Sequence, residues 1–239
     1  MTAISFSLNP DLEPRLLRQA YKRHGRVRIQ GFLASSAAAA LHTQLLERTD
    51  WLQVINSGEL LYELDRDIRA QMEPGKAAAL DQAVYAGARN GFQFRFESIR
   101  VPDDADARLA SADLLAGLAT FLSSPAVIAL FHDITGEGAI RFSDAQATAY
   151  SPGDFLTGHD DAVDGKHRFA AYVLGLTPRW RLEWGGQLLF HGDHGTISHG
   201  EMPGFNTLDL FTVPQLHSVS EVTRAAANRR YSVTGWLRG

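Results

Sequence analysis

Residues 150–161 read YSPGDFLTGHDD, and they lie near the start of a C-terminal half whose pattern of residue types differs from that of the rest of the chain. After Gly138, short β-branched and aromatic runs follow one another, separated by glycine and proline turns. Short strands at this spacing, with no helical pattern between them, predict an all-β barrel or sandwich. The predicted strands cover residues 145–150, 169–176, 187–191, 207–213, 218–222 and 230–237.

The first half of the chain is predicted to be mainly helical. Pro14 suits the first turn of a helix that Gly25 ends, and Ser35 or Ser36 is predicted to cap a second, alanine-rich helix. We expect one domain, residues 1–239, in which a helical layer (1–137) supports the β half (138–239). Further helices are predicted at 76–88, 107–122 and 125–134, and strands at 26–32 and 92–96.

The amino-acid composition excludes several classes of functional site and makes one class of partner less expected. The 239 residues contain no cysteine, which excludes disulfides, thiolate zinc sites, iron–sulfur clusters and cysteine nucleophiles. The net charge of −4 lowers the expectation of nucleic-acid binding, because duplexes are bound largely through neutralised phosphates. The basic residues between Arg15 and Arg28 are interpreted as the solvated face of the first helix and the following strand. We recognise no signal peptide and no membrane-spanning stretch, and we expect a cytoplasmic protein.

Two histidines and an aspartate could form a metal site. In an extended segment residues i and i+2 face the same way, so His159 and Asp161 are predicted to project together while Asp160 points away. His217, on a later strand, would complete a set of two imidazoles and one carboxylate. Such a set suits Fe(II) oxygenases, because ligands on one face leave positions open for co-substrate and oxygen.

A second group of residues follows this predicted metal site. Arg230, Thr234 and Trp236 would share one face of the last strand. A guanidinium can hold the far carboxylate of a dicarboxylate co-substrate through two parallel hydrogen bonds, and the Thr234 hydroxyl could add a donor beside it. Trp236 is expected to belong to the core.

From about Gly138 to the C-terminus, the sequence resembles the prolyl-hydroxylase branch of the 2-oxoglutarate/Fe(II) oxygenases, nearest the ribosomal-protein and hypoxia-sensor prolyl hydroxylases. The resemblance implies a double-stranded β-helix (jelly roll) with an N-terminal helical layer. The motifs that carry it are Tyr150-x-x-Gly-Asp-Phe-Leu-x-x-His-Asp-Asp161, Trp184-Gly-Gly-Gln-Leu, Asn206-x-Leu-x-Leu-Phe, His217-x-Val-x-Glu-Val and Arg230-x-Ser-x-Thr-Gly-Trp236.

The resemblance also implies site residues and cofactors. His159, Asp161 and His217 would bind Fe(II), and Tyr150, Arg230 and Thr234 would contact 2-oxoglutarate, with ascorbate as a stimulant of turnover. One departure puts the full set of co-substrate contacts in doubt. The family often has a co-substrate-binding tyrosine where this chain has Gly175, and Tyr172 is predicted to point to the opposite face.

Structural roles compete with these interpretations. His159 and Asp161 could form an ordinary turn, with His217 a satisfied polar residue. Arg230 could pair with Glu221, and Tyr150 could be a packing residue. Another histidine group, His191, His194 and His199 with Asp193, has a spacing that a surface metal site could use, but residues 192–203 are interpreted as a loop.

The expected function is hydroxylation of a prolyl residue in a protein, with the translation machinery as a candidate source of substrates. A free amino acid or small metabolite remains the main alternative. A nucleic-acid demethylase, suggested by the six-residue spacing of Arg224 and Arg230, and a non-catalytic binding module are further alternatives. Substrate selection would fall to residues 51–65 and 91–99.

Overall fold

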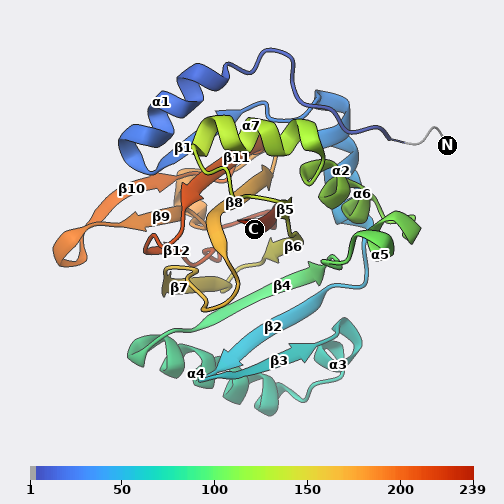
Figure 1. The fold of residues 1–239 in the computed structure, drawn as a ribbon. Helices are drawn as coiled ribbons and strands as arrows, with labels where there is room; N and C mark the ends of the chain where they lie inside the picture. Colours follow the sequence, from blue (N-terminus) through green and yellow to red (C-terminus); the bar gives the residue numbers. More distant parts are fainter. Residues whose placement is uncertain (1–3) are drawn as a thin grey trace.

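The computed structural model describes residues 4–239, and their strands form one curled, mostly antiparallel sheet of 13 strands (Figure 1). Along the sheet the main path runs β1-β11-β8-β13-β6-β4-β7-β12-β9-β10. The strands are β1 (Arg26–Gln30), β2 (Leu52–Ser57), β3 (Leu60–Leu64), β4 (Phe94–Arg100), β5 (Phe142–Ser143), β6 (Gln146–Tyr150), β7 (Phe155–His159), β8 (Arg168–Leu176), β9 (Leu188–His191), β10 (Ile197–Glu201), β11 (Phe205–Thr212), β12 (His217–Val219) and β13 (Arg230–Arg238).

Strand β4 joins the two halves of the jelly roll. Its C-terminal part pairs with β6, from Glu97↔Ala149 to Arg100↔Gln146, while Phe94 and Arg95 at its start pair with β7. On one side β6 leads to β13, β8, β11 and β1, and on the other side β7 leads to β12, β9 and β10. The sheet therefore curls around a space between β13 and β6 on one side and β7 and β12 on the other.

Helices cover the outside of the larger half of the sheet, over β1, β11 and β8 (Figure 1). Apolar residues of these helices pack with the strands into the main core, and Phe131 of α7 also stacks on Phe32, in the connection after β1, with ring centroids 6.3 Å apart. This layer keeps the sheet's outer face from water. Altogether, the helices of residues 4–239 are α1 (Pro14–His24), α2 (Ser35–Glu47), α3 (Arg66–Ala70), α4 (Pro74–Asn90), α5 (Ala105–Ala110), α6 (Leu114–Leu122) and α7 (Pro125–Thr135).

The N-terminal half also contributes a β-hairpin that the sequence did not reveal. Residues 52–64 form β2 and β3, joined by a turn at Gly58 and Glu59, and β2 pairs with β4. In Figure 1 this hairpin and α4 lie at the far end of the molecule from α1 and α7. The strands of this hairpin, Leu52–Ser57 and Leu60–Leu64, thus extend the sheet next to the space enclosed by the jelly roll.

Most predicted elements are confirmed, but three details are wrong. The helix predicted at 107–122 is two helices, because Asp113 caps a new one by accepting a hydrogen bond from the Leu115 N–H. Neither Ser35 nor Ser36 is the N-cap of α2; that position is Ala34, without a side-chain cap. The predicted loop 192–203 contains β10, which pairs with β9.

No single helix among residues 4–239 is long and apolar enough to span a bilayer. The pair α6 and α7 would pass by length and composition together, but it is bent by 54°.

Candidate active site

The three predicted metal ligands meet at one end of the jelly roll. His159 is the last residue of β7, and it lies directly opposite His217 of β12 in the antiparallel register. One carboxylate oxygen of Asp161 lies 3.5 Å from His159 Nε2, and the other lies 3.5 Å from His217 Nε2. Among residues 4–239, His159, Asp161 and His217 are the one group of three or more histidine, cysteine or acidic side chains whose possible metal-ligand atoms all lie within 4.8 Å of one another.

Backbone carbonyls orient both imidazoles toward this point. His159 Nδ1 lies 3.0 Å from the Thr157 carbonyl, and His217 Nδ1 lies 2.7 Å from the Gln215 carbonyl. Because a carbonyl can only accept, each Nδ1 carries the hydrogen and each Nε2 presents its lone pair to the shared point. The donor set of two imidazoles and one carboxylate therefore fits Fe(II).

The local charges also suit a cation. Burial, followed by the nearby His159, lowers the pKa of His217 to about 4, so its ring is neutral near pH 7. Burial alone would raise the pKa of Asp161, but hydrogen bonding and charge from His159, and the charge of His217, hold it below its ordinary value. A neutral histidine and an ionised carboxylate are the protonation states that metal binding requires.

Asp161 reaches the site by a different route from the one predicted. Strand β7 ends at His159, and Asp161 lies two residues beyond it with a φ of 63°, in the left-handed region. Strand alternation therefore does not align the two ligands, although the ligands themselves are the predicted ones. Asp160 is exposed, and its carboxylate accepts a hydrogen bond from the Ala162 N–H.

Arg230 lies buried beside the metal site without an anionic partner. Its side chain is 4% exposed, and its guanidinium lies 5.0 Å from the centre of the Tyr150 ring, across the β13–β6 pairing. Within residues 4–239 its only side-chain hydrogen bond is a 3.5 Å contact to the Ser232 hydroxyl, and Nε has none. Glu221 instead accepts a hydrogen bond from Tyr85.

An unpaired buried guanidinium points to an anionic ligand. Burial lowers the pKa of Arg230 and makes its charge costly unless an anion binds. The far carboxylate of 2-oxoglutarate meets this need, so the residues present fit the co-substrate as they fit the metal. Arg224, the alternative co-substrate arginine, is exposed.

One cavity of about 300 Å³ joins these groups, and all six predicted site residues line it. Trp236, which was expected to be core, packs against a core cluster and also lines the cavity. The Arg168 guanidinium lies 3.6 Å from the centre of the Trp236 ring and donates to the Asp161 carbonyl. The position of Trp236 on the face shared by Arg230 and Thr234 was the signal that could have revealed its place. The six are Tyr150, His159, Asp161, His217, Arg230 and Thr234.

Gly175 has no room for the tyrosine that the resemblance expects there. A Cβ at this position would lie 2.7 Å from the Gly204 carbonyl oxygen and 2.8 Å from the Thr207 hydroxyl. Tyr172 also lines the cavity, but its hydroxyl donates to the Asp144 carbonyl. Arg230 therefore has no tyrosine at either position to help it hold the co-substrate.

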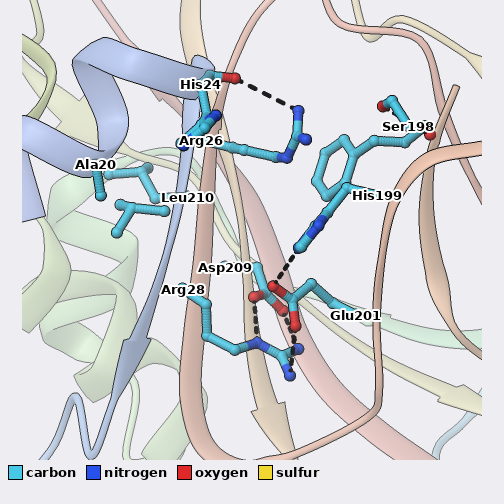
Figure 2. Close-up of a pocket in the computed structure, with 11 residues that line it drawn as sticks. Ala20, His24, Arg26, Arg28, Ser198, His199, Glu201, Asp209 and Leu210 are labelled. Carbon is cyan, nitrogen blue, oxygen red and sulfur yellow. Dashed lines mark hydrogen bonds and ion pairs between the residues drawn. The ribbon is translucent and has the colours of Figure 1, made fainter. Parts of the chain in front are cut away.

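At the β1 edge of the sheet, between α1 and β10, a pocket of about 450 Å³ contains a charged network (Figure 2). Arg28 holds Asp209 through two hydrogen bonds of 2.6 and 2.7 Å, and it also pairs with Glu201 at 2.9 Å. Burial raises the pKa of Asp209, while Arg28 and then Arg230 oppose the shift. The sequence placed Arg28 on a solvated face. That prediction is wrong, because Arg28 is paired with Asp209 and Glu201 and has a structural role.

The other histidines do not assemble a metal site within the described part of the chain. His191 Nε2 lies 2.8 Å from the Ser218 hydroxyl, and His199 hydrogen-bonds Glu201. His194 is exposed on the turn between β9 and β10.

Comparisons with known proteins agree with this geometry. Residues 145–238 match the model of the 2OG-Fe(II) oxygenase superfamily, whereas no curated protein matches the chain by sequence. Similar solved structures include a Pseudomonas putida prolyl-4-hydroxylase (19% identity, 95% of this chain and 98% of that chain, TM-score 0.60). Another is a prolyl hydroxylase from Trichoplax adhaerens in complex with a hypoxia inducible factor peptide (16% identity, 94% and 88%, TM-score 0.61).

The shared fold does not specify the reaction. The non-haem α-ketoglutarate-dependent epimerase SnoN from nogalamycin biosynthesis is also similar (13% identity, 94% and 83%, TM-score 0.55). The likeness to the superfamily is instead based on residues 145–238, which contain the metal triad and Arg230. Over residues 145–238 the chain matches the 2OG-Fe(II) oxygenase superfamily, and this match, together with the geometry of the site, supports a dioxygenase-type enzyme.

Proposed function

We propose that this protein is a 2-oxoglutarate- and O2-dependent hydroxylase of a prolyl residue in a polypeptide. The observation that carries the proposal is the lining of the cavity, which combines the charged site residues with aromatic rings. The triad and Arg230 line it together with the rings of Phe92, Phe94 and Phe96. Aromatic walls suit a pyrrolidine ring, which has no side-chain donor of its own.

Each group has a task that follows from its position. His159, Asp161 and His217 would hold Fe(II), and Arg230, with Tyr150 and Thr234, would hold 2-oxoglutarate. When bound, this pair supplies oxidation of a substrate C–H bond by O2, with 2-oxoglutarate released as succinate and CO2. The protein orients the target carbon, and the Phe92 to Phe96 rings keep water from the reacting atoms.

The rim supports a substrate larger than the cavity. Leu60, Leu61 and Tyr62 on β3 are 63%, 45% and 49% exposed, and Phe92 is 49% exposed. Contiguous exposed apolar side chains beside a cavity are typical of surfaces that bind another molecule. Trp51 differs from them: it is 1% exposed and belongs to the main core.

We further propose that the polypeptide substrate is cytoplasmic. Ribosomal proteins and translation factors are the first candidates, because the motif stretches resemble the prolyl hydroxylases of ribosomal proteins. Quantitative mass spectrometry of these proteins should find a hydroxylated proline that disappears when the gene is deleted. Wild-type protein should restore it, and the His217→Ala variant should not. If no prolyl oxidation depends on the gene, the proposal is wrong.

A small carboxylate substrate is the second candidate. A cavity of about 300 Å³ can hold a single amino acid, and Arg100 and Arg168 line it besides Arg230. The two candidates separate in an assay of succinate formation with purified protein, Fe(II), ascorbate and 2-oxoglutarate. A metabolite that stimulates succinate formation many-fold, when no proline-containing peptide does, would favour the second.

A further inference from the structure

A second, larger cavity lies between α4 and the β2–β3 hairpin, and we call it the flanking groove. Its volume is about 790 Å³. In Figure 1, α4 runs beside β2 and β3, on the side away from α1 and α7. Mainly apolar side chains line the groove, among them Ile55, Tyr62, Leu64, Leu80, Val84 and Phe92.

The two buried polar residues of the groove wall, Asn56 and Gln93, are already satisfied. Gln93 Nε2 donates to both the carbonyl and the side-chain oxygen of Asn56, at 2.6 and 3.0 Å, and Asn56 Nδ2 donates to the Phe92 carbonyl at 3.0 Å. These contacts fix the hairpin against the start of β4. Lys76, which also lines the groove, is exposed to water, so what the buried part of the wall offers is apolar surface.

Along α4 much of that surface is open to water. Val84 is the one buried residue of this 17-residue helix, although Leu80 and Ala83 also line the groove. Opposite the helix, the Tyr62 ring is half exposed. Covering these side chains with an apolar group would release water from both walls at once, which is the main source of binding free energy for such a surface.

The groove is continuous with the catalytic cavity through Phe92, which lines both. Its ring centroid lies 5.7 Å from that of the metal ligand His159. The hairpin forms the partition: Leu61 lines the catalytic cavity and its neighbour Tyr62 lines the groove, as expected for successive residues of a strand. A chain that leaves the cavity over Phe92 therefore enters the groove.

We propose that the flanking groove binds an apolar side chain of the polypeptide substrate, at a fixed distance in sequence from the target proline. This inference rests on the proposed function, and it assigns the groove to the substrate itself. A free metabolite would be enclosed by the catalytic cavity and would need no second compartment. An extended peptide, which advances about 3.3 Å per residue, would reach from one compartment to the other.

The test uses holoenzyme and synthetic peptides of about 12 residues, long enough to extend well beyond the catalytic cavity. Each peptide carries one central proline in a glycine and serine background, and a single leucine occupies a different flanking position in each member. Ala83→Trp fills the groove from an exposed position of α4. Ala86→Trp is the matched control, because Ala86 is equally exposed on the same helix and lies outside the groove.

We expect leucine at one offset to lower the KM for proline hydroxylation by roughly tenfold or more, the effect of burying one such side chain. Ala83→Trp should abolish this preference and Ala86→Trp should keep it. Both variants should hydroxylate the leucine-free peptide, and form succinate without peptide, at the wild-type rate.

Two results would overturn the inference, and they differ in what they say about the proposed function. If no offset lowers the KM, or if Ala83→Trp retains the preference, the groove does not bind substrate, although hydroxylation of the peptides still supports the proposed function. If wild-type enzyme hydroxylates no peptide while it still turns over 2-oxoglutarate, the prolyl function fails and the groove assignment falls with it.

Discussion

Two arginines of this protein are equally buried, one in the helical layer and one in the jelly roll, and their surroundings are opposite. Arg108 on α5 and Arg230 on β13 are each 4% exposed. Arg108 donates to the carbonyls of Pro102 and Ser143, with a longer contact to that of Ala119, and to the Ser123 hydroxyl, which leaves only Nη2 without a partner. Arg230 has one long contact, to Ser232.

The difference separates a structural group from a binding group. The carbonyls around Arg108 take the place of water inside the folded chain, so its burial costs little. Arg230 is buried without comparable compensation, which lowers the stability of the free protein and is offset only when an anion binds. We therefore take a buried charge without an anionic partner in the described part of the chain as a mark of the binding site, and the predictions below test that criterion.

The largest effect is expected at the metal ligands, which likewise find their common partner outside the chain. Asp161→Ala should abolish iron binding and turnover, because the two histidines alone leave the cation's charge unbalanced. Asp160→Ala, which only removes an acceptor for the Ala162 N–H, should keep both. Iron stoichiometry and succinate formation measure the pair. Loss of iron in Asp160→Ala with retention in Asp161→Ala would reverse the assignment.

Arg230→Leu should raise the KM for 2-oxoglutarate strongly, because a buried carboxylate would lose a charge-assisted partner worth roughly 2–5 kcal/mol. The melting temperature of the ligand-free protein should not fall, since an uncompensated buried charge has been removed. Arg224→Leu is the control and should change the KM little. The opposite order of the two KM values would instead favour the alignment typical of nucleic-acid demethylases.

Arg108→Leu should have the reverse profile. It leaves the Pro102 carbonyl without a donor and removes one of the two donors to the Ser143 carbonyl, which should lower the free energy of unfolding by on the order of 3 kcal/mol. At a temperature where the variant remains folded, its KM for 2-oxoglutarate should equal that of the wild type. Chemical denaturation and steady-state kinetics provide the two readings, and a raised KM with unchanged stability would contradict the comparison.

The site residues could be predicted from sequence because their order along the chain is itself informative. A His-x-Asp pair, a later histidine and an arginine on a final strand carry more information together than separately. The conformation of Asp161 could not be predicted, because a positive φ after a strand leaves no pattern in residue types. The partners of Arg28 could not be predicted either, since Asp209 and Glu201 lie far from it in sequence.

The missed strands share a physical cause. Strand alternation in a sequence reports burial of one face, and β10 and most of β3 are exposed on both faces. Their hydrogen bonds to β9 and β2 define them as strands without any apolar periodicity. The rim of the cavity was therefore the least predictable part of the site, although its apolar composition was visible at residues 60–62.

The smallest effects are expected at two threonine hydroxyls, one that lines the catalytic cavity and one that is hydrogen-bonded within the protein. Thr234 lines the catalytic cavity. Thr234→Val keeps the shape and removes one neutral donor to the co-substrate, so the KM for 2-oxoglutarate should rise about fivefold, equivalent to about 1 kcal/mol. Thr177 is the matched residue within the protein, because its hydroxyl donates to the Tyr231 carbonyl and accepts from the Tyr231 N–H. Thr177→Val should lower the free energy of unfolding by about 1–3 kcal/mol and leave the KM unchanged. If Thr234→Val lowers stability and leaves the KM unchanged, Thr234 belongs with the structural groups.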